Sequence, residues 1–199
     1  KEQQVRLQNV LTDTGLGNVI DELTPDASTR EFYRIKSGDT TLIGCVYAAG
    51  DAEGPRQIID VTNLFLRAGL PVARVIRDFA ESGIVILEDL GEQILREYLL
   101  RSTPEDRDDL INAAIDLIPR IQAATELAIT SGSVAGKLRF DREKLLWELN
   151  FFKEHYFTSL RGKQIEQPAV PGIEEEFNEL AVWLEDRASV LCHRDFHAA

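Results

Sequence analysis

The spacing of hydrophobic positions divides the chain into a first half rich in strands and a second half rich in helices. Up to residue 91, short β-branched runs alternate with polar turns, which indicates an antiparallel sheet. Five strands are predicted, at 19–23, 31–36, 41–47, 71–76 and 84–87. The stretch 54–69 has helical periodicity and is predicted to pack on this sheet, after a short amphipathic helix at 2–12.

Residues 92–199 show helical periodicity and clear helix starts. Thr103, followed by a proline and two acidic residues, is predicted to be the N-cap of a helix. That helix should kink at Pro119, which has no backbone N–H to donate. Asp141 is predicted to cap a second helix, rich in aromatic residues, and 173–187 is predicted to form a third.

Composition and charge exclude several classes of function. The chain has 199 residues, of which 44% are hydrophobic and 28% charged, as in ordinary soluble globular proteins. Its net charge of −12 predicts no binding to nucleic acid or to anionic membranes. No apolar run approaches the ~20 residues that span a bilayer, and no signal peptide is evident, so a cytoplasmic protein is expected. Cys45 and Cys192 lack the spacing of a zinc site and are expected to be buried thiols.

The last ten residues carry the most specific motif of the chain. A short strand predicted at 190–191 leads directly into it. His193, Arg194 and Asp195, followed by four residues, match the catalytic-loop pattern H-R-D-x-x-x-x-N of phosphoryl-transfer enzymes. In that loop the Asp takes the proton of the acceptor hydroxyl and the Asn holds Mg²⁺. The Asn would follow Ala199, so we expect the metal ligands beyond this sequence and none within it.

The form of this motif, HRDFH, resembles the aminoglycoside phosphotransferase and choline kinase family of small-molecule kinases. Three further landmarks occur in the order found in that family: DASTREFYRI at 26–35, IVILEDLG at 84–91 and FDREKLLWELNFFKEHYF at 140–157. The first and third are most similar to bacterial kinases that phosphorylate the anomeric hydroxyl of N-acetylmuramate and N-acetylglucosamine. The resemblance implies a protein-kinase-like two-lobed α+β fold. Its nucleotide-binding lobe, a five-stranded antiparallel sheet with one helix, would be 1–91, and its mainly helical lobe, incomplete here, would be 92–199.

The resemblance also implies ATP and Mg²⁺ as cofactors and a small-molecule substrate, an N-acetylated amino sugar of cell-wall recycling. Asp195 would be the catalytic base, with His193 and Arg194 supporting its loop. Glu148 and His197 are candidate contacts to the sugar. These roles are carried over from the family motif and do not follow from spacing alone.

The nucleotide contacts are expected in the first half of the chain. The residues expected over the ATP phosphates are Ser28, Thr29 and Arg30. The segment expected to present its backbone to the edge of adenine is Glu88, Asp89 and Leu90. The strand at 41–47 lacks the Lys that kinases use to pair with the α- and β-phosphates. The nearest basic residues are Arg30, Arg34 and Lys36.

Three alternatives remain at this point. The chain could be an aminoglycoside or other small-alcohol kinase of the same superfamily, although the missing Lys favours the sugar kinases. It could be a non-catalytic kinase-like binding module, which the missing Lys would support. A metal hydrolase is a further alternative, because His193, Asp195 and His197 form a plausible H-x-D-x-H ligand cluster.

Overall fold

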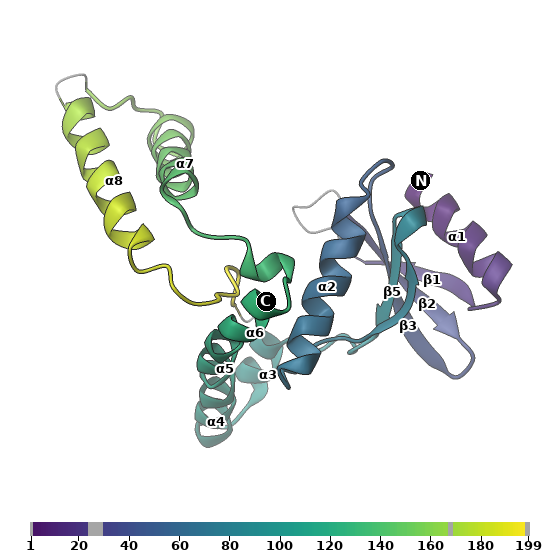
Figure 1. Ribbon diagram of the computed structural model, residues 1–199. Helices are drawn as coiled ribbons and strands as arrows, with labels where there is room; N and C mark the ends of the chain where they lie inside the picture. Colours follow the sequence, from purple (N-terminus) through teal and green to yellow (C-terminus); the bar gives the residue numbers. More distant parts are fainter. Residues whose placement is uncertain (1, 24–29, 167–168, 198–199) are drawn as a thin grey trace.

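The computed structural model of the protein describes residues 2–23, 30–166 and 169–197. A five-stranded antiparallel sheet, in the order β1-β2-β3-β5-β4, forms the centre of its first half (Figure 1). The strands are β1 (Asn18–Glu22), β2 (Glu31–Ser37), β3 (Thr40–Val46), β4 (Val75–Phe79) and β5 (Ile84–Glu88). The predicted α+β fold class, with its N-terminal sheet and helical second half, is confirmed.

Two helices, α1 (Glu2–Thr14) and α2 (Glu53–Arg67), cover opposite faces of the sheet (Figure 1). Successive side chains of a strand point to opposite faces, so β2 contributes alternately to two hydrophobic clusters. Tyr33 and Ile35 pack with residues of α1, whereas Phe32 packs on the α2 side. The α2 side of the sheet is the face on which the candidate nucleotide contact Arg30 lies.

The fourth strand begins later than predicted. We expected it at 71–76, but β4 runs from Val75 to Phe79. Its partner β5 ends at Glu88, whose N–H donates to the Arg74 carbonyl at 2.8 Å, so residues before Arg74 face no partner strand. Pro71 could not have donated to the ladder in any case.

The second half is built from helices. They are α3 (Leu95–Arg101), α4 (Pro104–Ile115), α5 (Leu117–Ala123), α6 (Thr125–Thr130), η2 (Val134–Gly136), α7 (Arg142–Lys153), η3 (Glu154–Leu160) and α8 (Val170–Glu185). The Thr103 hydroxyl accepts from the Asp106 N–H, which confirms the predicted cap. The helical run divides at Asp116, one turn before Pro119, as the missing proline N–H predicts. No helix in the described ranges is long and apolar enough to cross a membrane.

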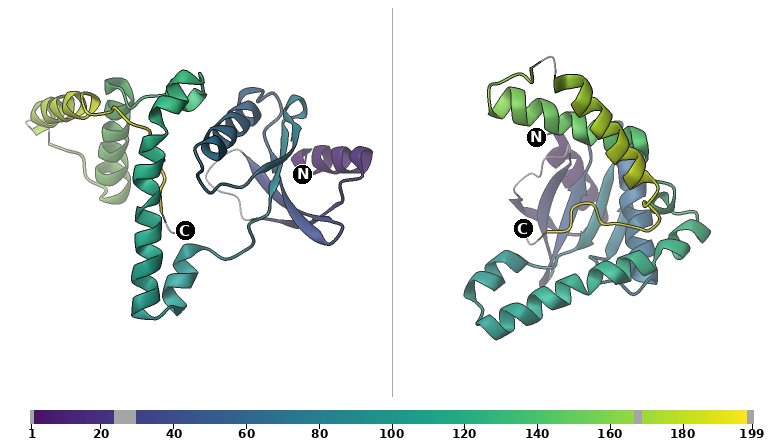
Figure 2. Two further views of the ribbon diagram at one scale, coloured as in Figure 1. Left: turned by 60° about the horizontal axis from the view of Figure 1, so that its bottom comes forward. Right: turned by 90° about the vertical axis from the view of Figure 1, so that its left-hand side faces the viewer.

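The predicted strand at 190–191 was wrong. After α8 the chain returns to α6 without regular secondary structure, on the side of the α4–α6 run that faces the sheet (Figure 2). There the Leu191 N–H donates to the Thr125 hydroxyl at 2.9 Å. A strand needs a neighbouring strand to pair with, and the partner here is a helical side chain. Cys45 is buried as expected, but Cys192, in this irregular segment, is exposed.

Candidate active site

Arg194 brings the motif segment into contact with Phe140 and with helix α7. Its backbone has φ +70°, a left-handed conformation that non-glycine residues adopt rarely and that often marks functional sites. Its guanidinium lies 5.0 Å from the centre of the Phe140 ring and 3.8 Å from Glu148 of α7. The structure therefore places Glu148, a candidate sugar contact, next to the loop that carries the candidate base. Glu148 also pairs with Lys144, one turn earlier on α7, at 3.0 Å.

Asp195 is open to solvent, with 85% of its side chain exposed. Its Oδ1 lies 3.3 Å from His197 Nε2, and the His193 ring contacts Phe196 edge to face. A substrate hydroxyl can therefore approach the carboxylate directly. Across residues 2–23, 30–166 and 169–197, no three His, Cys, Asp or Glu side chains are grouped as a metal site would require. The H-x-D-x-H segment accordingly does not form the cluster that a metal hydrolase would use.

Arg30 lies on the α2 side of the sheet. Its guanidinium is 5.5 Å from the centre of the Phe32 ring and 6.0 Å from that of the Tyr47 ring, within the range of cation–π contact. Burial raises the pKa of Tyr47 to about 12, although the nearby Arg30 opposes this shift. Ser28 and Thr29, the other expected phosphate contacts, lie outside the described residues.

The third strand carries no basic residue, and two of its α2-facing side chains pack in the core. Ile43 and Cys45 belong to the hydrophobic cluster beneath α2, and Cys45 is fully buried. Lys36, further along β2, is exposed. Of the three basic residues near this strand, Arg30 is therefore the one held against aromatic side chains of the sheet's α2 side.

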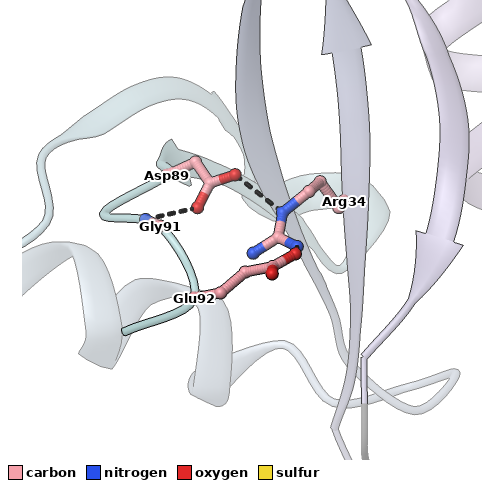
Figure 3. A network of polar contacts seen from close by, with 4 residues as sticks. All are labelled: Arg34, Asp89, Gly91 and Glu92. Atoms are coloured by element: carbon pink, nitrogen blue, oxygen red, sulfur yellow. Dashed lines mark hydrogen bonds and ion pairs between the residues drawn. The ribbon is translucent and has the colours of Figure 1, made fainter. Parts of the chain in front are cut away.

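Arg34 is hydrogen bonded to two carboxylates in the segment that follows β5 (Figure 3). Its Nε donates to Asp89 Oδ2 at 2.8 Å, and its Nη1 donates to Glu92 Oε1 at 2.6 Å. Glu88 accepts from the Arg74 N–H at 3.2 Å, so both carboxylates of the Glu-Asp pair have partners within the protein. Sequence reasoning missed this network. The signal for it was an Arg at a strand position between buried residues, combined with two acidic residues after the last strand.

Two hollows in the described surface lie away from these residues. One of about 460 Å³ lies between α1 and the loop before α2, lined in part by Arg6 and Asp51. The other, of about 350 Å³, lies beside α3 and is lined in part by Tyr98 and Thr103. The described motif residues line neither hollow, so size alone does not identify the candidate site.

Comparisons with known proteins agree with the family that the motifs indicated. The profile of a family described as "Phosphotransferase enzyme family" matches residues 19–199. The N-acetylmuramate/N-acetylglucosamine kinase of Pseudomonas aeruginosa is 28% identical over 179 residues, which cover 88% of this chain and 49% of that protein. Kinases of the same name from Neisseria meningitidis and Caulobacter vibrioides are 24% and 26% identical, over 86% and 99% of this chain and 49% and 61% of theirs. The chain spans about half the length of the first two relatives. The resemblance predicted from the motifs is confirmed.

Proposed function

This chain belongs to the phosphotransferase enzyme family, and we propose that the full-length protein is an ATP-dependent kinase for a hydroxyl group of an N-acetylated amino sugar. The observation that carries the proposal is the exposed Asp195 in a His-Arg-Asp loop. The segment after α8 that contains this loop runs along the side of the helices that faces the sheet (Figure 2). The names of the three relatives support the choice of substrate. We place such an enzyme in the cytoplasm, where ATP is available.

In this proposal residues 1–91 form the nucleotide-binding lobe and the helical part binds the sugar. The backbone of 88–90 pairs with the edge of adenine. Ser28, Thr29 and Arg30 contact the phosphates, and the guanidinium of Arg30 neutralises part of their charge. Arg30 suits this role because Phe32 and Tyr47 hold its side chain on the α2 side of the sheet.

Phosphoryl transfer depends mainly on positioning and charge neutralisation. Asp195 accepts the proton of the sugar hydroxyl as the oxygen of that hydroxyl forms its bond to the γ-phosphorus. The bond between that phosphorus and the bridging β,γ-oxygen breaks, and ADP leaves. His193 and Arg194 hold the loop, while Glu148 and His197 contact the sugar or orient its neighbours. No ligand set for Mg²⁺ is grouped among the residues described, so we assign no step to the ion.

The test is ATP consumption by the full-length protein with N-acetylmuramate, N-acetylglucosamine, choline or kanamycin as acceptor. We expect turnover on an N-acetylated sugar, and a loss of about 10²-fold or more in kcat for Asp195→Asn, because general-base catalysis contributes about 10²–10⁴-fold. Asp108→Asn is the matched control, because it makes the same substitution at an exposed aspartate of α4, and it should leave kcat unchanged.

Two other outcomes separate the alternatives. Turnover on choline or kanamycin alone would replace the sugar with another acceptor. ATP binding without turnover on any acceptor would favour the kinase-like binding module. The third strand, which is packed and has no cation, already supports that alternative.

A further inference from the structure

Arg34 connects β2 to the segment that follows β5. β3 lies between β2 and β5, so the Arg34 side chain crosses β3 to reach Asp89 (Figure 3). Only 11% of this side chain is exposed, and only 4% of the Asp89 side chain. Glu92, the second partner, is 81% exposed, and an exposed ion pair contributes little. The buried Arg34–Asp89 pair is therefore the main connection.

The Asp89 carboxylate is enclosed and yet charged. Burial by itself would raise its pKa, but hydrogen bonds from Thr41, the Gly91 N–H and Arg34 outweigh burial and lower the pKa below its ordinary value of 3.8. Its Oδ2 accepts from Arg34, and its Oδ1 accepts from the Gly91 N–H at 2.8 Å. One side chain thus joins β2, β3 and the turn that follows β5.

The backbone between Glu88 and Gly91 is hydrogen bonded at both ends. At one end, the Glu88 N–H is bonded to the Arg74 carbonyl across the sheet. At the other end, Gly91 has φ +91°, a conformation that glycine adopts readily, and its N–H is held by Asp89. The backbone between these two points is therefore bonded at both ends, and the Asp89 side chain that bonds the second end is itself bonded to Arg34.

We propose that Arg34 and Asp89 are positioning residues for the nucleotide. Their side chains hold the backbone of 88–90 in the orientation that pairs with the edge of adenine, so these side chains act through that backbone and do not themselves touch the nucleotide. The inference rests on the proposed function. It also explains why Arg34 does not replace the missing third-strand Lys: its guanidinium is committed to carboxylates. Arg suits this position better than Lys because its planar guanidinium donates in a fixed direction, as its Nε–H does to Asp89.

The test compares ligands with and without adenine. Calorimetric titration of the full-length protein, well below each variant's melting temperature, gives dissociation constants for ATP and for inorganic triphosphate, which offers phosphates alone. Arg34→Lys and Asp89→Asn should weaken ATP binding about tenfold, the value of about one hydrogen bond, and leave triphosphate binding within about twofold. Glu92→Gln, in the exposed part of the network, should change neither by more than about twofold.

Three results would overturn the inference. They are unchanged ATP affinity in Arg34→Lys and Asp89→Asn, equal weakening of both ligands, and wild-type protein that binds ATP no better than triphosphate. Equal weakening would assign Arg34 to the phosphates or to the fold as a whole. Wild-type protein that binds neither ligand would contradict the proposed function itself. If the first two variants do not fold, Thr41→Val removes one hydrogen bond to Asp89 without a change of charge, and the same comparison applies.

Discussion

At the scale of single residues, two aspartates have opposite surroundings. Asp195 is open to a substrate and has His197 beside it, whereas Asp89 is enclosed and has partners from two strands and a turn. An open carboxylate can receive a proton from an incoming hydroxyl. An enclosed one, fully hydrogen bonded, is suited to holding other groups in place.

The enclosed carboxylate predicts how stability depends on pH. Because the pKa of Asp89 is lowered on folding, its ionised form stabilises the folded protein at pH values above 3.8. That contribution is lost as the pH falls below 3.8 and through the folded-state pKa. Asp89→Asn should therefore cost about 1–3 kcal/mol in the free energy of unfolding at neutral pH, and less below pH 3.8.

Urea unfolding of wild-type protein and Asp89→Asn, from neutral to acidic pH, measures this difference. Glu92→Gln is the control, and its exposed carboxylate should change the free energy of unfolding by less than about 0.5 kcal/mol at any pH. A difference between wild type and Asp89→Asn that stays constant down to pH 2 would contradict the prediction.

At the scale of elements, helix α7 brings Glu148 to the motif loop, and its start is defined by one cap. The Asp141 carboxylate accepts from the Lys144 N–H at 2.9 Å. Asp141→Ala should reduce the free energy of unfolding by about 1 kcal/mol, whereas Asp141→Asn, which caps comparably, should cost little. Chemical denaturation of the two variants tests this, and equal losses would show that the charge matters more than the cap.

The observed helices and strands agree with the predicted ones where local signals in the sequence are strong. They differ where the bounds of an element depend on its pairing with another strand. The caps at Thr103 and Asp141 and the break before Pro119 were all predictable, because each depends on neighbouring residues. The start of β4 was not, because it depends on where the partner strand β5 ends.

At the scale of the whole molecule, α2 of the sheet half is joined to the helical half by Asp60. Its carboxylate accepts from the Ser133 hydroxyl at 2.6 Å and from the Val134 N–H at 2.8 Å. Ser133 is only 2% exposed, so neither water nor another group readily replaces this partner. A second link runs from Arg120 of α5 to the Gly69 carbonyl after α2 at 2.6 Å.

Removal of the first link should loosen the connection between the two halves. Asp60→Ala leaves a buried hydroxyl and a backbone N–H without their acceptor, so we expect a loss of about 1–3 kcal/mol in the free energy of unfolding. Hydrogen exchange should show faster exchange at the Val134 amide and unchanged exchange in the centres of β3 and β5. Asp108→Ala, on the exposed face of α4, should alter neither quantity, and an equal loss in both variants would contradict the role of Asp60.

The sequence by itself determined the sheet, most of the helices and the motif that carries Asp195, because periodicity, caps and short motifs are local properties of the chain. Only the tertiary structure decided how distant polar side chains are paired. Arg34 and Asp89 are 55 residues apart, and Asp60 and Ser133 are 73 apart. The partner of such a side chain depends on strand order and helix packing, and these cannot be predicted from local sequence patterns.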